Sequence, residues 1–256
     1  MSRRLDIYLT ERGDTESRSR AQELIKSGSV TVNGKTVIKT SYPVEDGDEV
    51  ALVREQICPY VSRGGFKLEA ALKGFTVDVR DLVCADIGAS SGGFTDCLLQ
   101  HGAKRVYAFD SGSGQLHPSL LRDQRVISRE NCNARYLTEN DLPEAVDLMV
   151  MDVSFISQTK LYGALVPLMK DGALLLSLIK PQFEVGRSAV GKGGIVRDEA
   201  KRKEAVETVV SCAEVFALHC EGVIPSPIRG GDGNVEFLAC FQKLSKPYGQ
   251  EKYDEN

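Results

Sequence analysis

The chain has 256 residues and a formal net charge of −4, so it is long enough for a small domain joined to a medium one. Its seven cysteines are scattered without any Cys-x-x-Cys pair and it has only three histidines, which argues against a disulfide framework and against a metal site. No apolar stretch approaches the roughly 20 residues of a membrane-spanning helix. The charged start, Met1 to Asp6, is unlike a signal peptide, so we expect a cytoplasmic protein with no membrane partner.

Basic residues are concentrated in two segments of this acidic chain. Residues 1 to 39 hold eight Lys and Arg against five Asp and Glu, and residues 180 to 203 hold seven against three. Local excesses of this size are often only solvated surfaces. Together with the negative total, they favour a protein that binds one structured RNA over a protein that coats nucleic acid without selection.

Residues 1 to 57 have the pattern of a small α+β domain. Amphipathic segments at 4–10 and 17–28 predict two short helices, the second ended by Gly28. The segment 30–38 carries Asn33-Gly34 between β-branched residues, which predicts a hairpin, and 50–53 predicts a closing strand.

This first domain resembles a small RNA-binding module that is found in a ribosomal protein of the small subunit, in pseudouridine synthases and in tyrosyl-tRNA synthetases. The matching residues are Arg4-Leu-Asp6, Ser19-Arg20-Ala21, Ile25, Gly28 and Val30-Thr-Val-Asn-Gly-Lys35. The resemblance implies that cationic side chains face RNA phosphates, for which the planar guanidinium of arginine is suited. These side chains are Arg4, Arg18, Arg20 and Lys26. A generic two-helix and hairpin domain with surface arginines is the alternative.

A linker at 58–62, marked by Pro59, precedes a second domain at 63–245 in which apolar strands alternate with helical patterns. Strands are predicted at 82–87, 105–109, 125–127, 147–151, 173–179, 218–224 and 236–241. Helices are predicted at 65–73, 93–101, 157–169 and 198–216. This alternation predicts an α/β, Rossmann-like fold: a mostly parallel sheet with one antiparallel strand and helices on both faces. Residues 246–256 are expected to form a flexible tail.

A glycine-rich turn, from Asp86 to Thr95, joins the first strand of this second domain to the next helix. Such a turn lets the backbone approach a nucleotide, and Asp110 after the next strand suits the ribose hydroxyls. Asp86 would repel a pyrophosphate but could hold the ammonium of a methionine moiety, directly or through water. We therefore predict S-adenosylmethionine, not NAD, with Asn133 either contacting adenine or capping a loop. The predicted cofactor-binding residues are Asp86, Gly88, Ser90, Gly92, Gly93, Phe94, Asp110, Asn133 and Asp152.

Seven motifs across nearly the whole chain resemble the TlyA type of haemolysin-named ribosomal RNA methyltransferases, whose catalytic half is similar to the FtsJ group of 2′-O-methyltransferases. They are Tyr60–Leu68, Asp86–Thr95, Asp110 with Gly114-Gln-Leu116, Asn133-Ala-Arg135, Asp152–Ser157, Leu178–Glu184 and Gly233–Glu236. The resemblance implies ribosomal RNA in a ribosomal subunit as the partner. It also implies a catalytic tetrad of Lys67, Asp152, Lys180 and Glu236.

The implied tetrad suits methyl transfer to a ribose. A 2′-hydroxyl is a poor nucleophile at neutral pH, so an enzyme must position it and remove its proton. Lys180 is the candidate base, because burial next to the second cation, Lys67, favours the neutral form of an amine. Asp152 and Glu236 would hold the two lysines in place.

The glycine-rich and basic segment 182–197 follows Lys180 directly. It predicts a lid that orders around RNA, with Arg187 and Lys192 as the RNA-binding residues. A solvated insertion loop is an equally good interpretation. The sequence carries no signal for an oligomeric state.

Three other functions fit parts of the sequence. Methyl transfer to a base would keep the fold, but that chemistry usually needs a nucleophilic cysteine or an Asn-Pro-Pro-Tyr-like clamp, and neither stands where the sheet would place it. A pore-forming or lytic haemolysin would match the haemolysin name, but the chain lacks a strongly amphipathic basic helix with aromatic anchors. A non-catalytic RNA-binding assembly factor is the third alternative, against which the complete tetrad argues.

Overall fold

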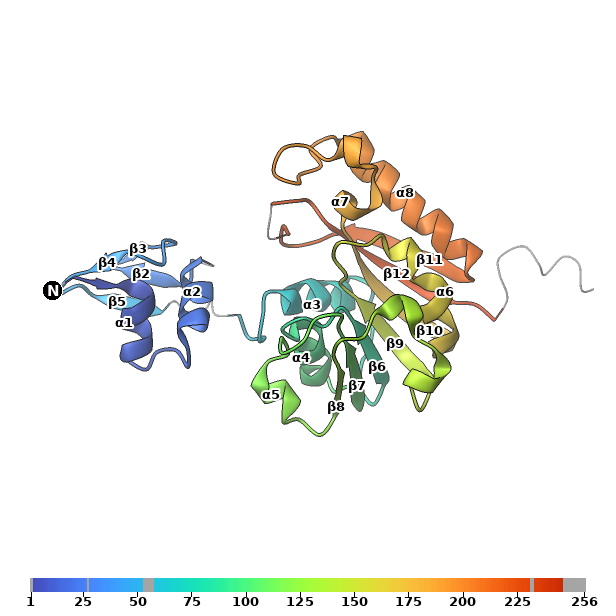
Figure 1. The fold of residues 1–256 in the computed structure, drawn as a ribbon, viewed down its shortest axis with the longest axis horizontal. Helices are drawn as coiled ribbons and strands as arrows, with labels where there is room; N and C mark the ends of the chain where they lie inside the picture. Colours follow the sequence, from blue (N-terminus) through green and yellow to red (C-terminus); the bar gives the residue numbers. More distant parts are fainter. Residues whose placement is uncertain (1, 27, 53–57, 231–232, 246–256) are drawn as a thin grey trace, which may run out of the picture. The chain divides into compact units, whose positions relative to one another are not determined.

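A computed structural model describes residues 2–26, 28–52, 58–230 and 233–245 of the chain. The chain divides into two compact units, Met1–Pro59 and Tyr60–Asn256 (Figure 1). Tyr60 is buried and packs edge to face on Phe66, and the backbone N–H of Val61 donates to Asp96. The end of the predicted linker is therefore folded onto the second unit. The predicted tail at 246–256 lies outside the described residues.

The first unit contains the predicted helices and hairpin. Its helices are α1 (Leu5–Glu11) and α2 (Arg18–Lys26), and its main sheet has the order β3 (Lys35–Thr36), β2 (Val30–Val32), β5 (Val50–Leu52). A two-residue pair, β1 (Arg3–Arg4) with β4 (Pro43–Val44), was not expected. Asn33 and Gly34 both have positive φ, as a tight hairpin turn requires, so the predicted hairpin is confirmed.

The second unit contains a seven-stranded sheet of the expected kind. Its strand order is β11-β12-β10-β9-β6-β7-β8. The strands are β6 (Val83–Ile87), β7 (Arg105–Phe109), β8 (Val126–Arg129), β9 (Val146–Met151), β10 (Met169–Ile179), β11 (Leu218–Pro225) and β12 (Phe237–Lys243). Strands β6 to β10 are parallel to one another, whereas β12 pairs antiparallel with both β10 and β11. The predicted Rossmann-like sheet with one antiparallel strand is confirmed.

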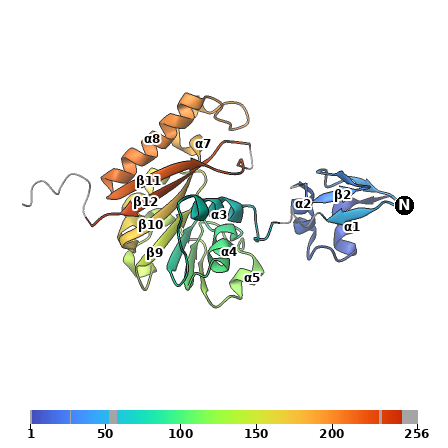
Figure 2. The same cartoon turned by 180° about the vertical axis from the view of Figure 1, so that it is seen from behind.

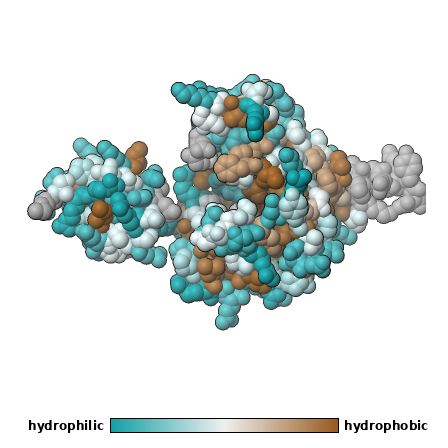
Figure 3. Space-filling view, viewed as in Figure 1, coloured by the Kyte–Doolittle hydropathy of each residue, from teal (hydrophilic) through white to brown (hydrophobic). Residues whose placement is uncertain are grey.

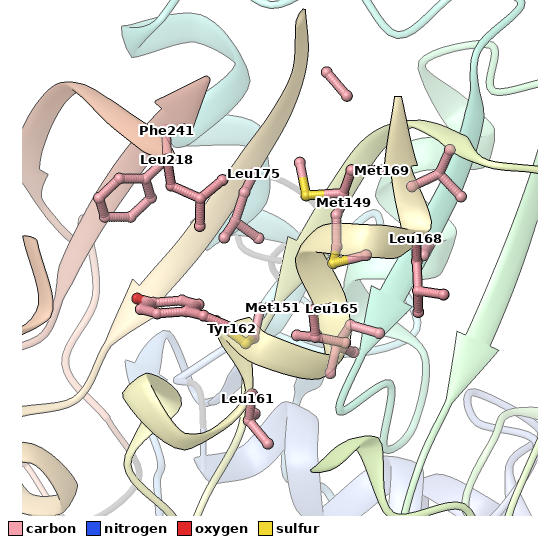
Figure 4. Packing of buried hydrophobic residues seen from close by; sticks show 14 of the residues in the cluster. Met149, Met151, Leu161, Tyr162, Leu165, Leu168, Met169, Leu175, Leu218 and Phe241 are labelled. Carbon is pink, nitrogen blue, oxygen red and sulfur yellow. The ribbon is translucent and has the colours of Figure 1, made fainter. Parts of the chain in front are cut away.

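Helices cover both faces of this sheet, as Figures 1 and 2 show. They are α3 (Gly64–Gly74), α4 (Gly93–Gln100), α5 (Pro118–Leu121), α6 (Tyr162–Leu165), α7 (Pro181–Glu184) and α8 (Glu199–Val215). Alternate strand residues point to opposite faces. Val83, Ala85 and Ile87 therefore pack in one hydrophobic core with α6 and α8, part of which is drawn in Figure 4. The side chain of Asp86 instead bonds to Thr95 on α4. None of the described helices is long and apolar enough to span a bilayer.

The prediction of one helix at 157–169 is wrong. That segment forms a 3₁₀ turn (Gln158–Lys160), the four-residue helix α6 and a second 3₁₀ turn (Val166–Leu168). Pro167 has no N–H to donate to the carbonyl four residues earlier, so it disfavours a continuous helix at this point. Met169 already pairs with Val146 as the first residue of β10. Tyr162 and Leu165 nevertheless point into the core, as the apolar spacing indicated.

Candidate active site

Two neighbouring cavities lie at the carboxyl ends of β6, β7, β9 and β10, where ligands bind in open α/β sheets. Their volumes are about 300 Å³ for the first and about 430 Å³ for the second. Four residues line both cavities and so mark their common boundary: Gly88, Ser90, Asp152 and Ser154. The two cavities thus form one elongated cleft.

The glycine-rich turn determines how closely the chain can approach this cleft. Gly88 has a φ of +85°, and a Cβ added there would lie 2.4 Å from the backbone oxygen of Asp152, so a larger residue does not fit. Gly92 has a φ of +95° and packs against Leu116 and Leu120, so it shapes the turn and lines neither cavity. The predicted residues of this turn that line the cleft are Gly88, Ser90, Gly93 and Phe94.

Asp86 is completely buried behind the glycine-rich turn and lines neither cavity. Its Oδ2 accepts a hydrogen bond from Thr95 Oγ1 at 2.7 Å, whereas Oδ1 has no hydrogen-bond partner among the described residues. Burial raises the pKa of Asp86 to about 7. A buried carboxylate oxygen without a donor fits the predicted role of accepting from an ammonium group, directly or through a water molecule.

Asp110 and Asn133, two of the predicted cofactor-binding residues, both line the second cavity. The carboxylate of Asp110 accepts from the backbone N–H of Ser90 and of Gly112, each at 2.7 Å, so its orientation is fixed by the glycine-rich turn. Each carboxylate oxygen retains a lone pair for a further donor, such as a ribose hydroxyl. The side-chain oxygen of Asn133 accepts from Arg135 N at 3.0 Å and caps a 3₁₀ turn, which is the loop-capping role.

The four residues of the implied tetrad form two ion pairs at the first cavity. Lys67 on α3 is buried, and its Nζ lies 2.6 Å from Glu236 Oε2. Lys180, directly after β10, has its Nζ 2.5 Å from Asp152 Oδ1 and donates to Ser154 Oγ at 2.9 Å. Lys67, Asp152 and Lys180 line the cavity, and Glu236 lies behind Lys67. Each lysine therefore has its own carboxylate: Glu236 for Lys67 and Asp152 for Lys180.

Five polar residues at the first cavity were not assigned from the sequence: Ser62, Arg63, Ser91, Ser154 and Arg229. Both arginines are exposed, and Ser154 bridges to Lys180. Arg63 and Ser154 lie inside motifs that carried the family resemblance, so their position in those motifs was an available signal. Arg229 had no such signal. Within the described part of the chain, no group of three or more His, Cys, Asp or Glu side chains could hold a metal ion.

The predicted RNA-binding residues of the first unit differ in their surroundings. Arg4 and Arg18 both bond to Asp6, at 3.0 and 2.9 Å, and Gln22 donates to the same carboxylate at 2.8 Å. Asp6 is fully buried, and its bond from Arg4 contributes most to holding its pKa well below the usual range. Arg4 and Arg18 are exposed and so present guanidinium edges to solvent, and Lys26 is exposed as well.

The side chain of Arg20 donates to the carbonyl of Cys58 at 3.4 Å. Arg20 is partly buried, so its environment differs from that of the exposed Arg4 and Arg18.

The predicted lid is tied to the rest of the site by Asn234. Arg187 and Lys192 are exposed on this segment. The buried Asn234 accepts from Val196 N at 3.0 Å and donates to the carbonyl of Gly194 at 2.9 Å. Because Asn234 stands two residues before Glu236, the base of the lid is attached to the loop that carries a tetrad carboxylate.

Both parts of the chain resemble known proteins. Residues 60–243 match the family model of FtsJ-like methyltransferases, and residues 3–50 match the S4 domain. The 16S/23S rRNA (cytidine-2′-O)-methyltransferase TlyA of Mycobacterium tuberculosis is 43% identical over 92% of this chain and 88% of its own length. A solved structure of a protein described as a hemolysin, from Streptococcus thermophilus, is 41% identical, with a TM-score of 0.77 over 96% of this chain and 90% of that one.

A more distant structure shares the fold of the second unit. The S-adenosylmethionine-dependent methyltransferase of Mesorhizobium loti is 14% identical, with a TM-score of 0.51 over 68% of this chain and 96% of its own. The family expected from the motifs and the RNA-binding module expected at the front of the chain are both confirmed. The chain belongs to the FtsJ-like methyltransferase family and carries an S4 domain at residues 3–50.

Proposed function

We propose that this chain transfers a methyl group from S-adenosylmethionine to a ribose 2′-hydroxyl of ribosomal RNA. The observation that carries the proposal is the pair of lysine–carboxylate contacts at one cavity, beside the glycine-rich turn of a methyltransferase fold. The relative from Mycobacterium tuberculosis, named for cytidine-2′-O methylation of ribosomal RNA, supports the choice of substrate.

The cleft supports S-adenosylmethionine as the methyl donor. Asp110 would accept from the ribose hydroxyls and Asn133 would face the adenine in the second cavity. Gly88 lies at the boundary of the two cavities, so the methionine part would pass the buried Asp86 at that point. When bound, the cofactor supplies a methyl group already activated by the positive charge of its sulfonium.

The residues of the first cavity would activate the acceptor. The RNA hydroxyl must lie in line with the methyl group and lose its proton as the new C–O bond forms. We assign Lys180 as the base, held by Asp152 and Ser154; its ammonium must first release a proton to solvent, so that the neutral amine can accept the proton of the hydroxyl. Lys67, held by Glu236, adds positive charge that stabilises the developing oxyanion.

The charge distribution supports a structured RNA as the partner. Arg63 and Arg229 place positive charge on the wall of the first cavity, where the phosphates flanking the target ribose would lie. The S4 domain offers Arg4 and Arg18 to further phosphates, and Lys192 on the proposed lid adds another cation. The lytic alternative is not favoured, because no feature of the site supports membrane lysis.

Transfer of labelled methyl from S-adenosylmethionine to isolated ribosomal subunits and to naked ribosomal RNA tests the proposal. The label should enter RNA with wild type and not with Lys180→Ala. Because 2′-O-methylation blocks alkaline cleavage of the adjacent phosphodiester, each methylated position should appear as an alkali-resistant linkage. Label that enters bases and leaves every linkage cleavable would refute the ribose assignment.

A further inference from the structure

The loops after β9 and β10 are connected twice. These neighbouring parallel strands end at Met151 and Ile179, and the loops that follow carry Asp152 and Lys180. The first connection is the contact of Lys180 with Asp152 and Ser154 inside the cavity. The second lies outside the cavity, at the far end of both loops, and depends on Glu184.

Glu184 is the last residue of the single-turn helix α7, four residues after Lys180. Its Oε2 accepts from Ser157 Oγ at 2.5 Å, and its Oε1 accepts from the backbone N–H of Gln158 at 3.0 Å. Burial raises the pKa of this carboxyl group above its ordinary value, and the two hydrogen bonds oppose that effect. The side chain therefore lies in a partly buried position with both oxygens in use.

Gln158, which donates to Glu184, is itself held by further hydrogen bonds. Gln158 is buried; its side chain donates to the carbonyl of Leu178 at 3.5 Å and accepts from Tyr162 Oη at 3.1 Å and from Ser177 Oγ. Ser177 and Leu178 belong to β10 itself. Gln158 is thus bonded both to Glu184 and to β10, the strand that leads to Lys180. These contacts form a closed ring that runs from Lys180 through α7 to Glu184, then to Gln158 and back to β10.

The segment inside this ring needs such support. Residues 152–157 carry the two partners of Lys180, yet Ser154 and Phe155 are exposed, and Phe155 has a positive φ of 65°. That conformation is costly for an aromatic residue unless its surroundings impose it. Phe155 also packs on Phe183 of α7, with 5.4 Å between ring centroids. Figure 3 shows brown, hydrophobic atoms gathered around α7 in this part of the surface.

We infer that Glu184 is a positioning residue for methyl transfer: by fixing Ser157 and Gln158 to α7, it holds Asp152 and Ser154 against Lys180. The effect on catalysis rests on the proposed function, whereas the effect on the order of residues 152–157 does not. Glu184 lines neither cavity and so acts only through the loop. Because Asp152 and Ser154 line both cavities, its effect should fall on the chemical step and on cofactor binding, and not on binding of RNA.

Hydrogen–deuterium exchange of the protein alone tests the structural part. In Glu184→Ala the amides of residues 153–158 should exchange faster than in wild type, most of all that of Gln158, which loses its acceptor. Glu207→Ala is the matched control, because Glu207 lies exposed on α8 in a surface ion pair with Lys203. Unchanged exchange in Glu184→Ala would overturn the inference whether or not the protein methylates RNA.

Kinetics test the catalytic part. Glu184→Ala should lower kcat by about tenfold to a hundredfold, the loss expected when reacting groups are misplaced by a fraction of an ångström to about an ångström. The KM for cofactor should rise as well, because this loop lines the second cavity, whereas the KM for RNA should change much less. Glu184→Gln should recover most of the activity, because its amide can accept from Gln158 N and donate to Ser157 Oγ. A wild type that transfers no methyl group refutes the proposed function; an active wild type matched by Glu184→Ala refutes the positioning role.

A double-mutant cycle separates positioning from general destabilisation. If Glu184 acts through Ser154 and Asp152, then adding Glu184→Ala to Ser154→Ala should cost far less than it costs in wild type. Additive losses would contradict the inference. Should Glu184→Ala fail to fold, Ser157→Ala removes one of the two hydrogen bonds and should give a smaller loss of kcat of the same kind. An unchanged kcat in Ser157→Ala would then contradict the positioning role of Glu184.

Discussion

The two units hold their cations in opposite ways. In the S4 domain the carboxylate of Asp6 is fully buried, while its partners Arg4 and Arg18 have side chains that are 44% and 54% exposed. In the methyltransferase domain it is the cations that are hidden, because the side chains of Lys67 and Lys180 are only 10% and 12% exposed. The same kind of ion pair therefore displays charge in one unit and encloses it in the other.

We propose that this difference corresponds to two tasks. An exposed, pre-oriented guanidinium can meet a phosphate from solvent and supply affinity. An ammonium inside a cavity, paired with a carboxylate, acts on a single group that enters the cavity, where the lower dielectric strengthens each contact. We therefore expect changes in the S4 domain to alter RNA affinity and changes in the cavity to alter the chemical step.

The largest effect is expected from Lys180→Ala. Removal of a general base typically lowers the rate about 10²-fold to 10⁴-fold, whereas RNA affinity should hardly change, because Lys180 is enclosed in the cavity. Single-turnover methyl transfer and filter binding measure the two quantities. Lys201→Ala, on the exposed surface of α8, is the control and should be active. Equal losses of rate and of affinity would remove the distinction between the two units.

Glu236→Ala should destabilise the second unit strongly. It leaves the buried ammonium of Lys67 without its partner, and breaking a buried pair in this way costs about 3–5 kcal/mol of unfolding free energy. Glu204→Ala breaks the exposed pair with Lys201 and should cost less than about 1 kcal/mol. Urea unfolding of both variants measures the contrast. Similar midpoints would mean that the Lys67–Glu236 pair is not enclosed.

Asp86 sharpens the contrast with Asp6, because it is a buried carboxylate with no cation beside it. The pKa of an aspartate is about 4 in the unfolded chain, whereas the pKa of Asp86 in the folded protein is about 7. Folding therefore takes up a proton between these values, and this group's contribution to stability is lost as the pH rises from 4 to 7. Asp86→Asn should remove this pH-dependent loss. The free energy of unfolding of the variant should therefore rise relative to that of wild type by a few kcal/mol at most between pH 5 and pH 8. Thermal unfolding without cofactor measures this, and a constant difference would contradict it.

The smallest effect is expected from the exposed arginines. Arg4→Ala and Arg18→Ala should each weaken RNA binding and reduce the slope of log affinity against log salt by about one. The rate at saturating RNA should stay unchanged. Arg80→Ala, which breaks an exposed pair with Asp78 on the second unit, is the matched control. An unchanged salt slope would mean that these arginines only stabilise Asp6.

The elements that could be predicted are those whose pattern is local. Strand 105–109 was predicted to the residue, since a short apolar run between polar turns has one interpretation in an alternating fold. The segment 157–169 has helical spacing but is interrupted by Pro167, and competition with β10 decided its structure. The hairpin at Asn33-Gly34 could be predicted from its two turn residues alone.

The site was predictable as a set of residues and not as a set of contacts. The motifs named the four tetrad residues, but only the structure pairs Lys67 with Glu236, 169 positions apart. The convergence of Arg4, Arg18 and Gln22 on Asp6 likewise depends on how α1 and α2 pack. Glu184 lay within a recognised motif, but its role depends on partners in a different loop.

Replacement of one atom in the RNA tests the central claim most directly. Once the methylated nucleotide has been mapped, an RNA that differs only by a 2′-deoxyribose at that nucleotide can be compared with the unmodified RNA under single-turnover conditions. The two RNAs should bind equally well, and the deoxy substrate should accept no methyl group. Methyl transfer to the deoxy RNA at an undiminished rate would show that the two lysine–carboxylate pairs serve a different acceptor.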